Sequence, residues 1–495
     1  MDKKVPLLYN ALLLTGVNLL LRFVSTSFQV YLSGKIGAAG MGLLQMVLSV
    51  GGLAITIGMA GIRTATMYLC AEVIGQKKAD RMVGVLSNCI IYSLTISIPI
   101  AFLLYKFAPQ IAAKWIMDTD VTDAIHLLAI FLPINCLCGV MIGHFTGINR
   151  IGTLTLVEIV EQIISISTTV LLLTFWAVEN TSRACTSVIM GGGIGACFTL
   201  IALLVVKGRD IGNVYKSFSC KKKLLHTAIP LAIADNLKAG ISTTENLMVP
   251  KRLALYSGNI APLAAFGIVC GMVFPVLMFP AAILFGLAEL LIPELARCNA
   301  AGSRSRILHL TERSLLLALI YGSFCGGILF LCADNLCIKL YNTPEAGTYL
   351  RWYAVLAPML YCDAIVDAMT KGLGQQKICV RNNIITSALD VILLDVLLPK
   401  YGMYGYFISF SITHLLNFIL SIQLLRKQVG KLVRISNGLL ILLSAACALG
   451  AGYLLPKGIA AYCGFLTVFT AMLILFGVVG KQDLHWIQGL VKNKP

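Results

Sequence analysis

The chain carries little charge. Only 12% of its 495 residues are Asp, Glu, Lys or Arg, about half of the ~25% found in soluble domains. The segments between apolar runs are short. The largest on the predicted outside are roughly 106–122 and 334–351, and neither these nor the inside segments have room for a soluble catalytic domain. The chain also lacks a Gly-x-x-x-x-Gly-Lys-Ser/Thr segment, which excludes ATP hydrolysis by a P-loop.

Metal-binding cysteine motifs are absent as well. The chain has 16 cysteines but no Cys-x-x-Cys pair. Most of the cysteines lie inside apolar runs, where a thiol behaves as a small hydrophobic group. We therefore predict no metal centre and no cofactor.

The sequence instead has long apolar runs and is 58% hydrophobic. These runs predict an all-α integral membrane protein with about 14 transmembrane helices. The predicted spans are 7–32, 41–61, 83–105, 124–148, 154–178, 184–206, 225–249, 263–291, 307–333, 352–372, 383–398, 404–425, 438–455 and 459–480.

The basic residues set the predicted topology. With the N-terminus inside, most Lys and Arg fall in inside segments, as the positive-inside rule expects. This placement accounts for the net charge of +17 through anionic lipid rather than nucleic acid. We predict a multi-pass membrane protein with both termini in the cytoplasm.

A weak internal repeat divides the chain. The segment that begins Thr146-Gly147 after the fourth span is similar to the one that begins Lys371-Gly372 after the tenth. Ile62, at the end of the second span, is similarly matched with Ile292 at the end of the eighth. Repeated bundles with a site between them are usual in secondary transporters. The predicted domains are an N-lobe (1–206), a basic cytoplasmic linker (207–224), a C-lobe (225–430), and two further helices with a tail (431–495).

Two predicted helices carry a cation in the middle of a polar stripe. In span 7–32 the stripe is Thr15, Asn18, Arg22, Ser25 and Gln29. In span 225–249 it is Asp235, Lys238, Ser242 and Glu245. Members of each stripe are three or four residues apart, so they share one helix face. A charge at bilayer depth costs about 2.5–3.5 kcal/mol, so we expect these faces to line a polar cavity.

The cavity is predicted to bind an anionic substrate. The predicted substrate-binding residues are Arg22, Asn18, Ser25, Gln29, Lys238, Asp235 and Ser242. A guanidinium such as Arg22 suits a phosphate because it binds bidentately and stays charged. The alternatives are an ion pair of Arg22 with Glu158 or Glu161, and neutralisation of Lys238 by Asp235.

Carboxylates at membrane depth are candidates for binding a coupling ion, Na⁺ or H⁺. They are Glu158, Glu161, Asp363, Asp367 and Asp390. Asp363 and Asp367 lie one turn apart and would repel each other if both were ionised. The alternative is that Lys371 pairs with Asp367. Two other charges are expected to be simply solvated: Glu245 near an outer helix end, and Arg63 by snorkelling to the interface.

Several short motifs together resemble a known family. They are Gly61-Ile62-Arg63-Thr64-Ala65 with Glu72, Gly143-His144-Phe145-Thr146-Gly147, Glu161-Gln162-Ile163, Val249-Pro250-Lys251-Arg252-Leu253, Leu291-Ile292-Pro293-Glu294-Leu295 and Gly372-Leu373-Gly374. Their order and spacing resemble the stage V sporulation protein B group of polysaccharide-biosynthesis membrane proteins. That group belongs to the multidrug/oligosaccharidyl-lipid/polysaccharide (MOP) flippase superfamily, with the lipid II flippases and the multidrug and toxin extrusion (MATE) transporters. The resemblance implies two six-helix lobes plus two C-terminal helices, and Arg22 matches an arginine of the lipid II flippases' first helix.

The expected function is transport, with no enzymatic activity. The resemblance implies flipping of a lipid-linked, undecaprenyl-diphosphate-type saccharide for the cell wall or envelope across the bacterial cytoplasmic membrane by alternating access. The expected partners are that substrate, membrane lipids and envelope-synthesis enzymes, and we expect a monomer. One alternative is an ion-coupled multidrug exporter of the same fold, which the carboxylates favour and the two cations oppose. Another is a non-transporting membrane scaffold for envelope or spore-wall synthesis.

Overall fold

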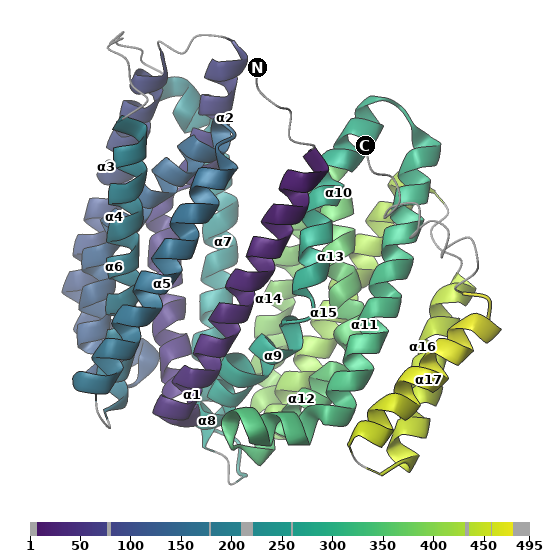
Figure 1. The fold of residues 1–495 in the computed structure, drawn as a ribbon. Coiled ribbons are helices and arrows are strands. Elements are labelled where there is room, and N and C mark those ends of the chain that lie inside the picture. Colours follow the sequence, from purple (N-terminus) through teal and green to yellow (C-terminus); the bar gives the residue numbers. More distant parts are fainter. Residues whose placement is uncertain are drawn as a thin grey trace. The chain divides into compact units, whose positions relative to one another are not determined.

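The computed structural model describes residues 7–76, 81–177, 180–208, 221–258, 261–430, 435–456 and 458–478 (Figure 1). Within these ranges the chain is helical and contains no strand. The first eight α-helices and two intervening π-turns are α1 (Leu7–Met59), α2 (Ile62–Gly75), α3 (Met82–Ile111), η2 (Ala112–Ile116), α4 (Thr122–Gly147), α5 (Ile151–Phe175), α6 (Thr181–Gly208), α7 (Lys221–Leu253), α8 (Pro262–Gly267) and η4 (Ile268–Val273). The remaining helices are α9 (Phe274–Met278), α10 (Ala282–Ala300), α11 (Arg304–Tyr341), α12 (Pro344–Ala354), α13 (Ala357–Gly372), α14 (Gln376–Tyr401), α15 (Met403–Val429), α16 (Ile435–Leu454) and α17 (Ile459–Leu475).

The described helices account for all the predicted spans. Eight segments are long and apolar enough to cross a membrane, and ten if each of two bent pairs forms one span. The bent pairs, 262–278 with 282–300 (64°) and 344–354 with 357–372 (56°), correspond to the eighth and tenth predicted spans. The first and second spans both lie in α1, on either side of a kink. Helices α7 and α14 are more polar, and α17 is short. The predicted all-α, multi-pass membrane architecture is confirmed.

Helix α1 contains two spans because it breaks at one glycine. Gly37 has φ 69° and ψ −179°, which is not helical. Only glycine adopts such angles without strain, because a Cβ atom would clash with the backbone. The boundary between the first two predicted spans therefore lies at Gly37, inside a helix that is otherwise uninterrupted.

The chain packs as two compact units. Unit 1 contains residues 1–271 and 387–405, and unit 2 contains residues 272–386 and 406–495. In unit 1, α3, α4, α5 and α6 run side by side, and α7 packs along α1 (Figure 1). In unit 2, α11 packs against α12, α13 and the α16–α17 hairpin. This division follows packing, whereas the predicted lobes describe a sequence repeat, and the lobe boundaries stay a prediction. Most of the predicted linker, 209–220, and the predicted tail beyond 478 lie outside the described residues.

The internal repeat appears in the structure as the same helix ending built twice. At the end of α4, the Arg150 N–H donates to the Phe145 carbonyl at 2.9 Å. At the end of α13, the Gln375 N–H donates to the Thr370 carbonyl, also at 2.9 Å. Left-handed residues occupy both turns, Asn149 (φ 61°) and Gly374 (φ 80°). These are Schellman endings, in which a left-handed residue lets the last carbonyls find donors.

Close helix contacts repeat at the same numbering offset. A Cβ on Gly147 would lie 2.6 Å from the carbonyl oxygen of Met67, and a Cβ on Gly372 would lie 2.8 Å from that of Ile292. Each residue of the second pair has a number 225 higher than its counterpart. The structure therefore matches Ile292 with Met67, and the sequence pairing of Ile292 with Ile62 was out of register. The short motifs located the repeat approximately, but they did not give the residue-by-residue alignment of its two halves.

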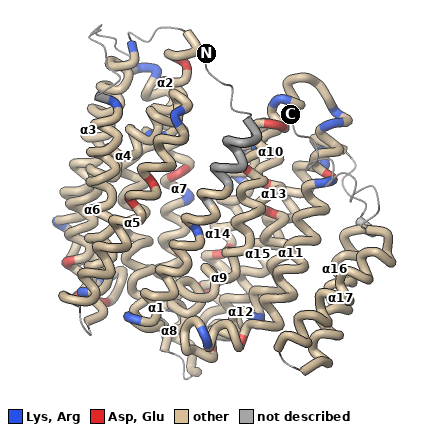
Figure 2. The backbone as a smooth tube through the Cα atoms, in the orientation of Figure 1, with Lys and Arg blue, Asp and Glu red and all other residues tan. Residues whose placement is uncertain are grey.

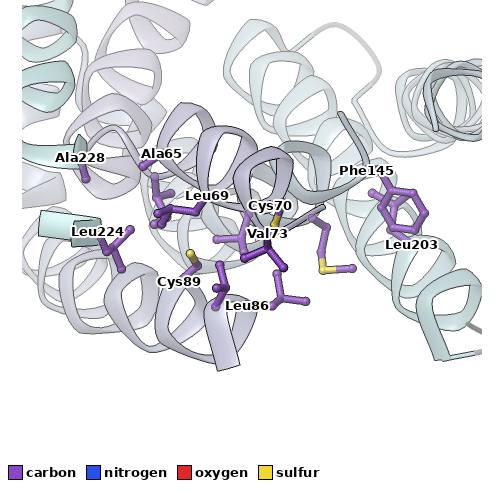
Figure 3. Close-up of a cluster of buried hydrophobic side chains, with 14 of the residues drawn as sticks. Ala65, Leu69, Cys70, Val73, Leu86, Cys89, Phe145, Leu203, Leu224 and Ala228 are labelled. Atoms are coloured by element: carbon purple, nitrogen blue, oxygen red, sulfur yellow. The ribbon is translucent and has the colours of Figure 1, made fainter. Parts of the chain in front are cut away.

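The core of unit 1 surrounds α2. A cluster of buried apolar side chains joins α2, α3, α4, α5, α6 and α7 (Figure 3). Its most buried members include Ile62, Ala65, Cys70, Leu86 and Phe145, each with essentially no exposed surface. This cluster fixes which face of α2 is buried, and so fixes where its polar residues point.

Candidate functional site

The polar stripe of α1 faces α5 in unit 1. The Gln162 side-chain amide on α5 donates to the Ser25 hydroxyl at 2.7 Å and to the Leu21 carbonyl at 3.1 Å. Arg22 and Gln29 on α1 are partly exposed. The side chain of Asn18 lies outside the described residues. Ser25, predicted to bind substrate, thus contacts another helix of the same unit.

The stripe of α7 lines a cavity in unit 1. The cavity has a volume of about 420 Å³ and is bounded by α1, the start of α2 and α7. Its lining residues are Thr56, Met59, Gly61, Arg63, Thr64, Asp235, Lys238, Ala239 and Ser242. We call it the α2–α7 cavity. The three α7 residues predicted from the sequence, Asp235, Lys238 and Ser242, all contribute to its wall.

Arg63 joins Lys238 in this cavity, which the sequence analysis missed. The segment Ala60–Gly61, with φ 43° and 72°, separates α1 from α2. A Cβ on Gly61 would come within 2.5 Å of the Ala228 carbonyl on α7, so only glycine lets the two helices approach this closely. Ile62 is anchored in the core, which leaves Arg63 exposed to the cavity.

The expectation that Arg63 is simply solvated at the interface was therefore incomplete. Its position near a span end was correct, but a span end can also border a cavity when the neighbouring helix is polar. Two features of the sequence could have indicated this: Gly61, which permits a close approach of another helix, and the polar face of the span that forms α7.

The charges of the α2–α7 cavity are mostly positive. Arg63 and Lys238 contribute two cations, and Asp235, an electrostatic neighbour of Lys238 on the same helix, contributes one carboxylate. Charged positions occur part-way along α5 and α7, away from the helix ends (Figure 2). Hydroxyls of Thr56, Thr64 and Ser242 complete the wall. Such a set of side chains can bind a phosphate and neighbouring hydroxyl groups.

The carboxylates of α5 lie close to Arg63. Arg63 and Glu161 are both electrostatic neighbours of Glu158. The Glu161 carboxylate accepts a hydrogen bond at 2.9 Å from the Thr199 hydroxyl on α6. The predicted ion-coupling residues Glu158 and Glu161 therefore form one electrostatic group with the Arg63 guanidinium, all within unit 1.

Asp363 and Asp367 have different partners in unit 2. Lys371 and Asp367 form an ion pair at 2.5 Å, the alternative that the sequence offered for Asp367. The Asn417 amide donates to Asp363 at 3.0 Å. Among the described residues, the second Asp363 oxygen and the Asn417 carbonyl oxygen are both buried and have no hydrogen-bond donor. Two such oxygens are suited to a proton or a small cation.

A second acidic pair lies in unit 1. Asp390 on α14 is an electrostatic neighbour of Glu245 on α7. Both side chains are partly buried, so Glu245 is not simply solvated as the sequence suggested. Next to it, the Asn246 amide donates to the Ser49 hydroxyl at 2.9 Å, which fixes α7 against α1. The polar stripe of α7 thus ends in a second polar group.

Within the described ranges, no three His, Cys, Asp or Glu side chains are grouped to hold a metal ion.

Comparison with known proteins agrees with this architecture. The MatE family model matches residues 15–171. The chain is 22% identical to stage V sporulation protein B of Bacillus subtilis (strain 168) over 98% of this chain and 93% of that protein. It is 21% identical to sporulation protein YkvU of the same organism over 44% of this chain and 51% of that protein.

Solved structures share the fold. The lipid II flippase MurJ in an inward closed conformation matches with a TM-score of 0.68 at 14% identity, covering 96% of this chain and 99% of that chain. An inward-facing multidrug resistance MATE family transporter also matches with a TM-score of 0.68, at 12% identity, over 83% of this chain and 94% of that chain.

The chain shares its fold with solved transporters of the MOP superfamily, and residues 15–171 match the MatE family model. Along nearly all its length the chain is also similar in sequence to stage V sporulation protein B. The resemblance drawn from the short motifs is thereby confirmed.

Proposed function

We propose that this transporter flips a lipid-linked saccharide diphosphate across the bacterial cytoplasmic membrane. The observation that carries the proposal is the α2–α7 cavity, in which Arg63 and Lys238 outnumber the single carboxylate Asp235. A diphosphate head group is anionic, and its transfer into hydrocarbon is opposed by loss of hydration. Cations and hydroxyls in the cavity replace that hydration through charge-assisted hydrogen bonds.

Arg22 remains a candidate ligand of the same substrate. It lies on α1 in unit 1, with Ser25 one turn away. Lipid II is the substrate that the name of one structural neighbour gives for that protein. We extend only the chemical class to this chain: a saccharide joined to a polyprenyl diphosphate.

Alternating access is supported by a seam within unit 1. A Cβ on Gly42 would clash with the Leu263 carbonyl, and a Cβ on Gly267 would clash with the Ala38 carbonyl. At the N-terminal end of α7, Lys223 forms an ion pair with Glu72 on α2. These contacts join α1 and α2 to α7 and α8, helices that the predicted repeat places in different lobes. We propose that the two ends of this seam open in turn.

We propose that a coupling ion binds at carboxylates that lack a hydrogen-bond donor or lie beside a second carboxylate. The Asp363–Asn417 pair leaves two buried oxygens without donors among the described residues. Glu245 and Asp390 form the second candidate. Uptake of Na⁺ or H⁺ at either group would change its charge and bias the conformational equilibrium.

The remaining parts of the proposal follow the predicted topology. Both termini lie in the cytoplasm, the chain works as a monomer, and envelope-synthesis enzymes supply its substrate. A multidrug exporter of this fold is the rival function, and the carboxylates of α5 and α13 favour it. The excess of cations in the α2–α7 cavity opposes it, because cationic drugs would be repelled.

Depletion of the protein followed by lipid analysis tests the proposal. A flippase predicts that a polyprenyl-diphosphate saccharide accumulates on the inner leaflet. Wild-type chain restores turnover, and Arg63→Gln/Lys238→Gln does not, although it reaches the membrane. The matched control is Lys377→Gln, an exposed lysine outside the cavity. Unchanged lipid intermediates together with new sensitivity to cationic dyes would establish the exporter instead.

A further inference from the structure

A second groove lies on the other side of α7 from the α2–α7 cavity. Two cavities of about 340 and 480 Å³ meet here, and both are lined by Leu53 and Trp115. One is bounded by α1, α3 and η2, and the other by α1, η2 and α7. Leu247 in this groove follows Lys238 by about two and a half helical turns, which places the two residues on opposite faces of α7. We call it the η2 groove.

The η2 groove is apolar along its length and basic at one end. The apolar walls come from α1 and α3, for example Val50, Leu53 and Phe107. The basic end holds Lys114, Lys251 and Arg252, with Trp115 between the two cavities. Tryptophan is enriched where apolar and polar layers of a membrane meet.

The pairing of these cations leaves positive charge available. Arg252 forms an ion pair with Asp395 on α14. Lys251 donates one hydrogen bond, at 2.8 Å, to the backbone carbonyl of Lys114, which leaves two of its three donors. Within the described part of the chain, no carboxylate pairs with the Lys114 ammonium. The neighbouring Asp118 instead accepts a hydrogen bond from the Asp120 backbone at 2.9 Å.

Local backbone geometry places the basic end. Helix α3 ends in the π-turn η2, followed by Met117 in a left-handed conformation with φ 62°. A left-handed non-glycine residue costs about 1–3 kcal/mol and persists where the surroundings enforce it. π-turns are frequent at functional sites, since the extra residue redirects the side chains that follow. Here the turn carries Lys114 and Trp115.

We propose that the η2 groove binds an anionic glycerophospholipid of the membrane. One acyl chain lies along the apolar walls, and the phosphate contacts Lys114 and Lys251. A transmembrane helix, about 10–12 Å across with its side chains, is too wide for cavities of this size. The saccharide substrate has its own cationic cavity on the opposite face of α7. The excess of cations at the basic end selects an anionic head group over a zwitterionic one.

Because the groove is bounded by α1, η2 and α7, a bound lipid contacts both sides of the α1–α7 seam. The lipid would therefore stabilise the arrangement in which the seam is closed. This inference does not depend on which substrate the transporter carries.

Fluorescence of Trp115 gives a direct test in the full-length chain. The other three tryptophans, Trp176, Trp352 and Trp486, are replaced by phenylalanine. The protein is reconstituted in phosphatidylcholine bilayers with brominated phosphatidylglycerol or brominated phosphatidylcholine as the quencher. We expect phosphatidylglycerol to be preferred, by about fivefold for each cation that contacts the phosphate.

Variants locate the preference. Lys114→Gln/Lys251→Gln is expected to abolish it, Lys251→Arg to retain it, and the distant Lys377→Gln to leave it unchanged. Equal quenching by the two lipids would overturn the proposal, since Trp115 would then meet only ordinary boundary lipid. A preference that survives the double variant would also overturn it. Displacement of phosphatidylglycerol by undecaprenyl diphosphate at equal concentration would show that the occupant is the carrier lipid instead.

Discussion

Glutamine substitutions at Arg63 and Lys238 test the chemistry of the α2–α7 cavity. Both side chains are exposed to the cavity, so their interaction with a phosphate is screened by water. At 4 Å, a pair of unit charges interacts by about 1 kcal/mol in water and about 4 kcal/mol near a protein surface. Hydrogen bonds to charged groups contribute about 1.5–3 kcal/mol. Because water screens these side chains, we take the low end of the hydrogen-bond range, about 1.5 kcal/mol for each substitution. Each substitution should therefore weaken diphosphate binding about tenfold.

The neighbouring carboxylate gives a change of the opposite sign. Asp235 lines the same cavity and repels an anionic ligand. Asp235→Asn should therefore strengthen binding, by a few-fold at the screened energies above. Arg63→Lys keeps the charge but loses the bidentate geometry, so its effect should be smaller than that of Arg63→Gln.

Titration of the purified chain with undecaprenyl diphosphate measures these effects. Arg63→Gln and Lys238→Gln are combined in a double-mutant cycle, with Lys377→Gln as the charge-matched control. A coupling energy above about 0.5 kcal/mol would show that both cations contact one head group. The reasoning is refuted if both single variants bind undecaprenyl diphosphate within twofold of wild type, or if Asp235→Asn weakens that binding.

Three further changes probe other parts of the structure. Gly61→Ala should lower the thermal unfolding temperature, because a left-handed alanine costs about 1–3 kcal/mol and its Cβ meets a carbonyl, whereas Gly152→Ala, in open space, should not. Glu72→Lys should slow transport measured in proteoliposomes by placing two cations together, and adding Lys223→Glu should restore it; no recovery would mean that the pair does not act across the seam. Asp363→Asn should leave substrate binding intact but remove the dependence of transport on Na⁺ or pH, and an unchanged dependence would place coupling elsewhere.

The transmembrane architecture was predictable because it depends on local composition. Apolar runs located every described span, and the helix period correctly placed Asp235, Lys238 and Ser242 on one face. Both signals come from residues that belong to the same helix. The sequence could not show which helix that face meets.

The missed features all depend on contacts between distant segments. Arg63 borders the cavity because Gly61 packs on α7, more than 160 residues later in the chain. Glu245 is likewise an electrostatic neighbour of Asp390 on α14, more than 140 residues later in the chain. The repeat was visible in short motifs, but its register followed only from the backbone contacts of Gly147 and Gly372.

The glycine contacts of Gly42 and Gly267 also bear on how easily the transporter changes shape. Both residues lie in helices whose backbone groups bond internally, and the described residues show no N–H···O bond between them. Parting these surfaces therefore removes dispersion contacts worth about 0.1–0.2 kcal/mol per atom pair. At these two glycines no strong polar partner must be replaced when the helices part. The glycine junction can therefore separate and re-form on thermal energy alone, and the polar resistance to opening lies elsewhere along the seam, at the Asn246–Ser49 hydrogen bond and the Lys223–Glu72 ion pair.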